Sequence, residues 1–413
     1  MKNIGSRTGS ILQNSCRGRL FSILFFFGVV PFFAQENNPL SEIMRSEAPK
    51  IKQIAKQLKQ HQVQLLYVAI NSENPQQPKY KEYRFQQEDS LYFYPASTVK
   101  LPIAVLAMEK LNQLNTQGIS ITQDTPFHII DPKTGNYIQQ LDSTHPQKAL
   151  TIGHLIKKIF LVSDNDAYNY LFDFVGKTTI NISLKNKGIE HTAIRHKFLY
   201  GADNENHWEY VFFNTQDTLY HQKSSYSPPL PPMPLESQKK GKAFIRSGEK
   251  VNSPMNFTNK NWMALSAQVE VLKRLIFPAS FPNTERFDLT EKQLNFLRHW
   301  MSRNTLESNI SAYNTSDEYY DSYGKFFLYG DTKGEMKDAL RIYNKVGYAY
   351  GTLTDVAYVK DRKNNIEFFL AGTVLVNENE TFNNDNYEFE SKGIPFLAEI
   401  GRKIYAYEKS QKQ

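Results

Sequence analysis

Cysteine is almost absent from this chain of 413 residues, in which Cys16 is the only one. Cys16 precedes the apolar run 20–34, whereas a lipid-bearing cysteine would follow such a run. If the N-terminal segment is removed, no cysteine remains, and disulfides, thiolate metal sites and a cysteine nucleophile are excluded. A chain of this length with 40 % apolar residues can still be stable through core packing alone.

Long hydrophobic runs are also missing, apart from a short one near the start. Basic residues at 2, 7, 17 and 19 precede the uncharged segment 20–34, an order that is typical of a secretory signal. The run is shorter than the ~20 residues that cross a bilayer. We therefore expect residues 1–35 to be a signal peptide or an uncleaved anchor, and the protein to be secreted or periplasmic, in a bacterial cell envelope. Any membrane contact would be made through this segment.

A concentrated positive charge is lacking as well. The net charge is +7, but residues 1–35 carry four basic residues and no acidic one, which leaves +3 for the rest. The remaining lysines are scattered among acidic residues, without a basic helix or an arginine-rich stripe. We expect no nucleic-acid partner. We also expect no metal, no organic cofactor and a monomeric protein.

Hydrophobic periodicity predicts the elements near both chain ends. The first half begins with helix, strand, strand and helix, at residues 41–62, 64–71, 80–85 and 101–111. Near the other end three strands precede a final helix, at residues 342–350, 353–360, 366–376 and 395–407. The fold class expected from this order is an α/β (α+β) sandwich. Its five-stranded antiparallel sheet is formed by both chain ends, and its first and last helices lie side by side on one face.

The middle of the chain shows mostly helical periodicity, which predicts an all-helical middle region. Its expected helices are residues 151–162, 166–176, 180–188, 260–276 and 291–302. Residues 195–254 read as a long irregular insertion, with a proline-rich stretch at 227–234 that cannot join a helix. The whole of 36–413 is therefore expected to be one domain with this insertion.

Ser97 and Lys100 form the first candidate catalytic pair. Three residues apart at the start of a helix, their side chains face the same way, and the serine lies at the positive helix end. A buried lysine of lowered pKa can take the proton that a serine must lose to become a nucleophile. The same spacing recurs at 237–240, 247–250 and 322–325. Only Ser97 lies between extended residues and a strongly apolar helix, although a helix-capping serine beside a surface lysine remains the alternative.

Two further groups of residues suggest a site around this pair. Ser163 and Asn165 lie in a break between two apolar helices, where they either cap the next helix or relay a proton and bind a substrate amide. Lys345 and Gly347 begin a strand segment in which glycine permits close approach of a ligand, while a solvent-facing lysine is the alternative.

The strand segment that contains Lys345 and Gly347 could also contribute to an oxyanion hole. The backbone N–H of Tyr348 could pair with that of Ser97 to bind the oxyanion. A more literal Lys-Thr-Gly sequence at 133–135 is interpreted as a turn, because Pro132 before it and Gly135 at its end are typical turn residues.

Together, 97–100, 163–165 and 345–347 resemble the three ordered motifs of class A β-lactamases and penicillin-binding proteins. The strand and turn at 348–359 are similar to those that follow the third motif in class A enzymes, and the resemblance extends over about 41–407. It implies that Ser97 is acylated, Lys100 assists, Ser163 shuttles protons and Lys345 attracts a substrate carboxylate. Asn165 and Gly347 would contact the substrate.

The sequence departs from the family pattern at two points. Val346 stands where the third motif usually offers a hydroxyl to the substrate carboxylate, and valine has nothing to donate. The glutamate that activates the deacylating water in class A enzymes has no clear counterpart, with Glu205 and Glu209 only at plausible distance in the sequence. Without such a base the acyl-enzyme would persist, since general-base assistance is typically worth about 10²- to 10⁴-fold.

The leading hypothesis is therefore an exported serine hydrolase that opens a β-lactam or a related cyclic or linear amide, a role that would connect it to antibiotic resistance. A second interpretation is an envelope peptidase, esterase or penicillin-binding protein with slow deacylation. A third is a non-catalytic envelope-binding protein on the same fold. In each case the partner is a small-molecule or peptidoglycan-like ligand.

Overall fold

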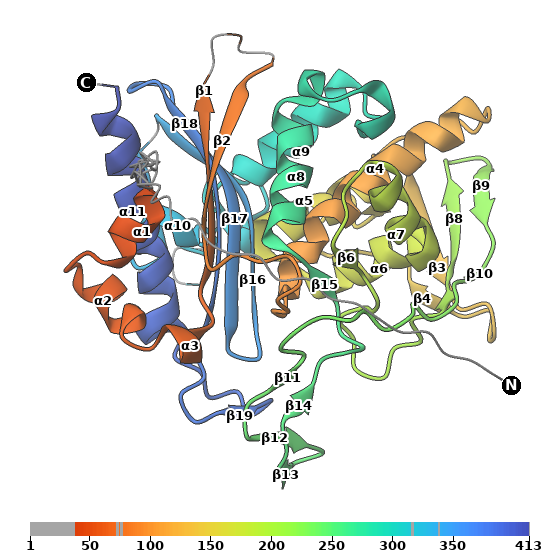
Figure 1. The fold of residues 1–413 in the computed structure, drawn as a ribbon. Coiled ribbons are helices and arrows are strands. Elements are labelled where there is room, and N and C mark those ends of the chain that lie inside the picture. The colour runs from red at the N-terminus through yellow and green to blue at the C-terminus, as the bar shows by residue number, and fades with distance from the viewer. Residues whose placement is uncertain (1–37, 72–73, 75–76, 315–317, 338, 413) are drawn as a thin grey trace, which may run out of the picture. The chain divides into compact units, whose positions relative to one another are not determined.

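The computed structural model describes residues 38–412, except 72–73, 75–76, 315–317 and 338. The predicted signal peptide or anchor at 1–35 lies outside the described residues. Within them, a central sheet has five antiparallel strands in the order β16-β17-β18-β1-β2. Their bounds are β1 (Gln64–Asn71), β2 (Lys79–Phe85), β16 (Leu340–Ala349), β17 (Thr352–Asp361) and β18 (Ile366–Leu375). Both chain ends thus build one sheet, as expected (Figure 1).

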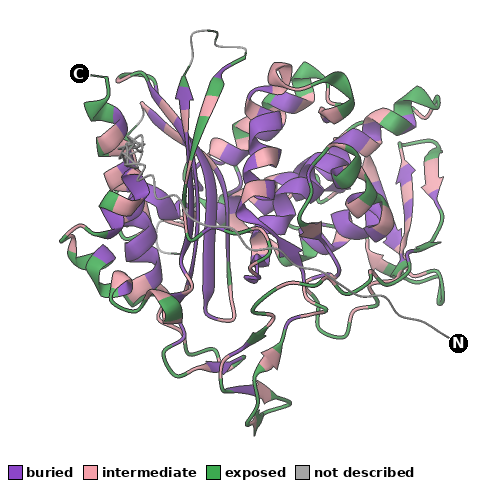
Figure 2. Ribbon diagram, viewed as in Figure 1, coloured by how far each residue is buried: buried purple, intermediate pink, exposed green. Residues whose placement is uncertain are grey.

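The alternation of side chains along β1 divides the core into two layers. Leu65 and Tyr67 belong to one buried cluster, and Leu66 and Val68 to the other, as the period of two along a strand requires. The first cluster is closed by the helices α1 (Pro39–Met44), α2 (Pro49–Ala55) and α11 (Ile394–Ser410). These helices contact one another, which confirms the predicted neighbouring first and last helices (Figures 1 and 2).

The single helix expected over 41–62 is wrong in one respect. The chain forms three short helices there, α1, α2 and α3 (Leu58–His61), because α1 ends at Met44 and Pro49 starts a new helix at its first position. Proline is well suited to a first helical turn but cannot continue an existing helix. Gln62 then adopts a left-handed conformation with φ of 43°, which ends α3 before β1.

The other face of the sheet is covered by the helical part of the chain. Its helices are α4 (Lys100–Thr116), α5 (Ile152–Val162), α6 (Asn165–Val175), α7 (Lys177–Asn186), α8 (Leu265–Ile276) and α9 (Glu291–Ser302). α8 packs directly on β17 and β18. α4 runs through the centre of this region and is buried along most of its length (Figure 2).

The middle region is not all-helical, which corrects the sequence-based expectation. A second antiparallel sheet has the strands β3 (Pro126–Ile130), β4 (Tyr137–Gln139), β5 (Leu150–Thr151), β8 (Glu209–Phe213) and β9 (Thr218–Gln222). These strands have at most five residues, and such short runs carry little periodicity. Trp262–Met263 likewise forms strand β15 rather than the start of α8.

The predicted insertion at 195–254 consists of loops and short strand pairs. These strands are β7 (Asn206–His207), β10 (Ser225–Tyr226), β11 (Lys239–Lys240), β12 (Ala243–Arg246) and β13 (Glu249–Val251), together with β8 and β9. β11 pairs with β14 (Met255–Asn256), and β12 also pairs in parallel with β19 (Thr381–Phe382). The segment is thereby tied to the C-terminal part of the chain.

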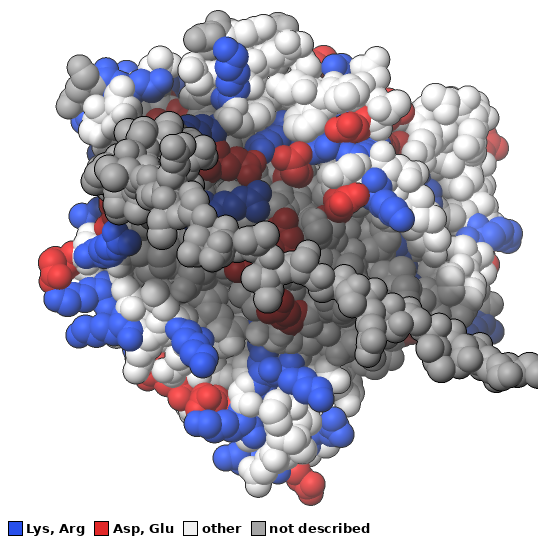
Figure 3. All heavy atoms as spheres, viewed as in Figure 1, with Lys and Arg blue, Asp and Glu red and all other residues white. Residues whose placement is uncertain are grey.

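Charges of both signs are interspersed on the face shown in Figure 3, as far as its described atoms show. None of the helices in the described part of the chain is both long and apolar enough to span a membrane.

Candidate active site

Ser97 lies on a short 3₁₀ helix, η1 (Ala96–Val99), that leads directly into α4. Ala96 enters it with φ of 46°, a left-handed conformation that is uncommon for residues other than glycine. The N–H of Thr98 donates to the carbonyl of Pro95 over 3.1 Å. The N–H groups of Ala96 and Ser97 precede this bond and so have no acceptor within the turn, as at any helix start.

Strand β16 packs against this turn at Gly347. A Cβ atom at Gly347 would lie 2.5 Å from the Pro95 carbonyl oxygen, 2.7 Å from the Ser97 nitrogen and 2.8 Å from the Thr98 nitrogen. Because these are backbone atoms, no side-chain rotation could make room. Glycine is therefore what allows the strand to run beside the backbone of Ser97, whereas the sequence suggested close approach of a ligand at this position.

Lys100, the first residue of α4 and three positions after Ser97, is fully buried, with 0 % exposure. Its Nζ donates to the backbone carbonyl of Ser163 and, over 2.7 Å, to Oδ1 of Asn165. Burial lowers the pKa of Lys100 to about 7, although the nearby carboxylates of Asp164 and Asp166 partly oppose this. A neutral amine has two N–H donors and one lone pair. If both donors go to these oxygens, the lone pair is left for a third group.

Ser163 lies between the two lysines of the site. It ends α5 with φ of 56°, and Asp164 caps α6 by accepting from the N–H of Ala167 over 2.7 Å. The helix-capping function is therefore carried by the aspartate. The Ser163 Oγ is 2.8 Å from Nζ of Lys345 and 3.5 Å from Nζ of Lys100, so one hydroxyl connects both amines.

Lys345 does not point to solvent, since only 3 % of it is exposed. Its Nζ donates to Ser163 Oγ and to the carbonyl of Val346, over 2.8 and 2.9 Å. Burial, followed by repulsion from Lys100, lowers the pKa of Lys345 well below its usual value. The site therefore holds two buried amines whose pKa values are both lowered from that of an ordinary lysine.

A cleft of about 540 Å³ opens beside these residues. It is lined by most of the predicted site residues, namely Ser97, Ser163, Asn165, Lys345 and Tyr348. Six further lining residues are aromatic, namely Phe160, Tyr320, Tyr323, Phe326, Tyr387 and Phe389. Tyr348 is 52 % exposed, which is unusual for a large aromatic side chain in a sheet.

Two residues near the site were not found from the sequence. The ring of Phe198 lies 5.1 Å from Nζ of Lys100, where it helps to exclude water. Glu390 lines the cleft from the π-helical turn η5 (Phe389–Gly393). Both residues are far from the motifs along the chain and belong to no motif of their own. No local signal in the sequence could have identified them.

The other pairs with the spacing of Ser97 and Lys100 are not among the residues that line this cleft. Lys325 is buried, and its Nζ donates to the carbonyls of Met301 and Ile342 and to Oδ1 of Asn344 over 2.8–3.0 Å. Nζ of Lys240 donates to Gln62. The serines of the remaining positions, Ser237 and Ser247, have positive φ angles in turns. The 133–135 segment is the turn that was predicted, with the N–H of Lys133 donating to Asp131.

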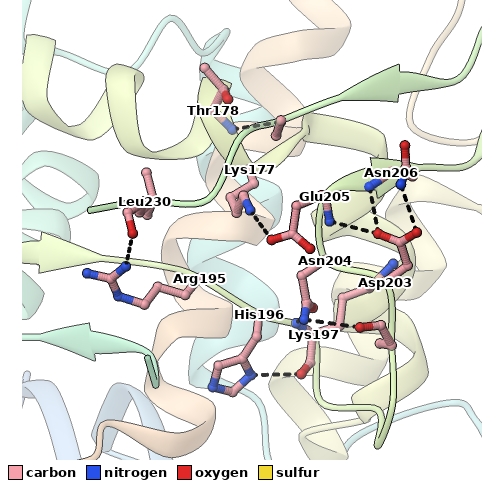
Figure 4. A network of polar contacts seen from close by, with 12 residues as sticks. Lys177, Thr178, Arg195, His196, Lys197, Asp203, Asn204, Glu205, Asn206 and Leu230 are labelled. Atoms are coloured by element: carbon pink, nitrogen blue, oxygen red, sulfur yellow. Dashed lines mark hydrogen bonds and ion pairs between the residues drawn. The ribbon is translucent and has the colours of Figure 1, made fainter. Parts of the chain in front are cut away.

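Glu205 and Glu209, the two glutamates considered as deacylating bases, contact other partners. Glu205 forms an ion pair with the buried Lys177 over 2.7 Å (Figure 4). It follows the loop 197–204, across which the N–H of Lys197 donates a hydrogen bond to Oδ1 of Asn204. Glu209 on β8 pairs with His221 on β9 over 2.6 Å. Neither glutamate is among the residues that line the cleft.

No group of three or more His, Cys, Asp or Glu residues that could hold a metal ion occurs in the described ranges. The site described above consists of hydroxyl, amine, amide and aromatic groups. Such groups fit acyl transfer between a serine and a carbonyl compound.

Comparison with known proteins places the chain in a family. A sequence model described as "Beta-lactamase enzyme family" matches residues 48–407, while no curated protein matches significantly. Similar solved structures include a β-lactamase from Sphaerobacter thermophilus, with 14 % identity, a TM-score of 0.48 and coverage of 91 % of this chain and 97 % of that one. A β-lactamase from Desulfarculus baarsii has 13 % identity, a TM-score of 0.46 and coverage of 87 % and 98 %. The structure of PBP-A has 12 % identity, a TM-score of 0.47 and coverage of 90 % of this chain and 97 % of that one.

Proposed function

Since the chain belongs to the beta-lactamase enzyme family, we propose that it is a serine hydrolase whose Ser97 Oγ forms an ester with the acyl group of a β-lactam or a related cyclic or linear amide. The observation that carries this proposal is the buried Lys100. Its hydrogen bonds to Ser163 and Asn165 can occupy both N–H donors of the neutral amine. The remaining lone pair can then accept the proton of a serine one helical turn earlier.

The proposed reaction starts when Lys100 takes the proton from Ser97 and Oγ attacks the substrate carbonyl carbon. The N–H groups of Ser97 and Tyr348 stabilise the oxyanion, a contribution of roughly 3–4 kcal/mol per donor in related sites. As the C–N bond breaks, Ser163 passes a proton to the leaving nitrogen. A linear amide then releases a separate amine, whereas the amine of a β-lactam or other cyclic amide stays attached to the acyl group of the ester. Asn165, with its oxygen held by Lys100, offers its NH₂ group to a substrate carbonyl.

Slow hydrolysis of the ester is the second part of the proposal. Glu205 and Glu209 are paired elsewhere, and among the described residues that line the cleft only Glu390 is a carboxylate. Glu390 is exposed and comes from the opposite end of the chain to Ser97. This favours an envelope peptidase, esterase or penicillin-binding protein over a fast β-lactamase.

The proposed location is the cell envelope, outside the cytoplasm. It rests on the basic and apolar order of residues 1–34, and it would bring the cleft to peptidoglycan-like substrates. Breakdown of β-lactams and antibiotic resistance would follow from this activity only if turnover were fast.

Intact-protein mass spectrometry tests the proposal. The wild type, Ser97→Ala and the control Ser237→Ala are incubated with a penicillin, an activated ester and a fluorophosphonate. We expect one added acyl group on the wild type and on Ser237→Ala, none on Ser97→Ala, and slow loss of the penicilloyl group. Rapid loss would favour a β-lactamase. If no reagent modifies the wild type, the protein is a non-catalytic binding protein and the proposal is wrong.

A further inference from the structure

The charges in the cleft are unlike those expected for a site that recognises anions. Among the described lining residues, Lys345 and Glu390 are the charged types. Nζ of Lys345 is buried and donates to Ser163 Oγ and to the carbonyl oxygen of Val346. Val346, next to it, has no side-chain donor. The amine of Lys345 therefore directs two of its hydrogen bonds into the protein.

Glu390 supplies the cleft with a carboxylate, and so with a negative charge. Its side chain is exposed and forms no ion pair with any described residue. Tyr320 and Tyr348 line the same cleft as Glu390, and the pKa values of their hydroxyls are raised by burial and then by the Glu390 carboxylate. A cation also lies near, because Nζ of Lys333 is 5.2 Å from the centre of the Tyr320 ring, but Lys333 does not line the cleft.

Aromatic rings that contact one another line the same cleft as this carboxylate. Tyr348 meets Phe389 edge to face at 5.4 Å between ring centres, and Tyr387 lies 5.3 Å from Phe389. Phe326 lies 6.1 Å from Tyr348 on the other side. The faces of aromatic rings attract cations, and several rings together with a carboxylate are the usual composition of ammonium-binding sites.

We propose that Glu390, together with the ring of Tyr348, makes the nucleophile's cleft selective for acyl donors that carry an ammonium group rather than a carboxylate. This inference rests on the proposed function, because it concerns which acyl donors reach Ser97. It assigns to Glu390 a specificity-determining position, with the ammonium group between its carboxylate and the aromatic wall. The substrate class is thus an amine-bearing amide or ester, such as a peptide with a free amino group.

The test uses three thioesters of equal length that end in an ammonium group, a neutral amide or a carboxylate. The rate of acylation of Ser97 is followed by intact mass at low and high salt. We expect the wild type to prefer the ammonium over the carboxylate thioester about threefold to thirtyfold at low salt. The preference should decrease at high salt, because exposed charges are screened.

Variants separate the contribution of Glu390 from the general charge of the protein. Glu390→Gln should lower the ammonium preference about twofold to fivefold, and Glu390→Lys should reverse it. Tyr348→Leu, which keeps the backbone N–H, should lower the ammonium preference, because the cation–π contact with the substrate is lost. Glu249→Gln changes the net charge equally at an exposed position of β13 outside the cleft, and should leave the preference unchanged.

The two proposals fail in different ways in this experiment. If none of the thioesters modifies the wild type at Ser97, the proposed function itself is wrong. If all three acylate Ser97 but the carboxylate reacts as fast as or faster than the ammonium thioester, the selectivity proposal is overturned while the hydrolase stands. The selectivity proposal is also overturned if Glu390→Gln has no larger effect than Glu249→Gln.

Discussion

Gly347→Ala is the substitution whose effect on the site can be derived most directly. The new Cβ would lie 2.5 Å from the Pro95 carbonyl oxygen and 2.7 Å from the Ser97 nitrogen. Non-bonded carbon and oxygen atoms do not approach within 3.0 Å, so the strand and the turn must separate by about 0.5 Å or more. This movement displaces the N–H of Ser97 from the N–H of Tyr348, which together would form the oxyanion hole.

The expected loss follows from this displacement. A misplacement of about 1 Å in a catalytic site can cost roughly 10²-fold in rate, and loss of one oxyanion donor costs about 10²- to 10³-fold. For 0.5 Å we expect acylation of Ser97 to slow about tenfold to hundredfold. Overpacking should also lower the free energy of unfolding by about 1–3 kcal/mol.

The assay measures the acylation rate with an activated ester, together with thermal unfolding to verify that the variant is folded. Gly334→Ala is the matched control, because its Cβ would meet only the Thr332 hydroxyl at 3.4 Å in an exposed loop. A folded Gly347→Ala protein that reacts at the wild-type rate would refute the assignment of the oxyanion hole to this contact.

Three further predictions concern buried charged groups. Burial lowers the pKa of Lys100 to about 7, so the fraction of neutral amine should increase with pH. The rate at which a fluorophosphonate modifies Ser97 should therefore rise with a midpoint near pH 7. A flat rate profile between pH 5 and 9 would contradict Lys100 as the base. Lys325→Met leaves three oxygen acceptors without their donor and should lower the free energy of unfolding in urea by about 2–5 kcal/mol. Asp173→Asn removes a fully buried carboxylate that contacts Lys197 and His207. It should lower the free energy of unfolding, also measured in urea, by about 3–5 kcal/mol. A decrease below about 1 kcal/mol would show that these contacts contribute little.

The central sheet could be predicted because its strands are long and rich in β-branched and aromatic residues. Residues 342–376 contain three such runs separated by turns, and the observed strands β16, β17 and β18 differ from the predicted bounds by one or two residues. The second sheet was missed because β3 and β8 have five residues each. Their pairing is a contact between segments about 80 residues apart, which local periodicity does not reveal.

The motif residues could be located for a related reason. Ser97 was distinguished from three other serines by the extended segment before it and the apolar helix after it, and both are local properties. What surrounds these residues could not be predicted, because it depends on the tertiary fold. Phe198 reaches Lys100 from a loop about 100 residues away, and Glu390 reaches the cleft from the last turn before α11.

The two lysines at Ser163 explain why the site can work near neutral pH. Their Nζ atoms lie 2.8 and 3.5 Å from one oxygen, so they are at most about 6.3 Å apart. Two positive charges at that distance repel each other by about 3 kcal/mol at an effective dielectric constant of ~20, which lowers the affinity for a second proton about a hundredfold. Burial acts in the same direction. Both effects lower the affinity of the pair for a second proton. In the proposed reaction, the hydroxyl between the amines passes a proton from one to the other as Ser97 is deprotonated.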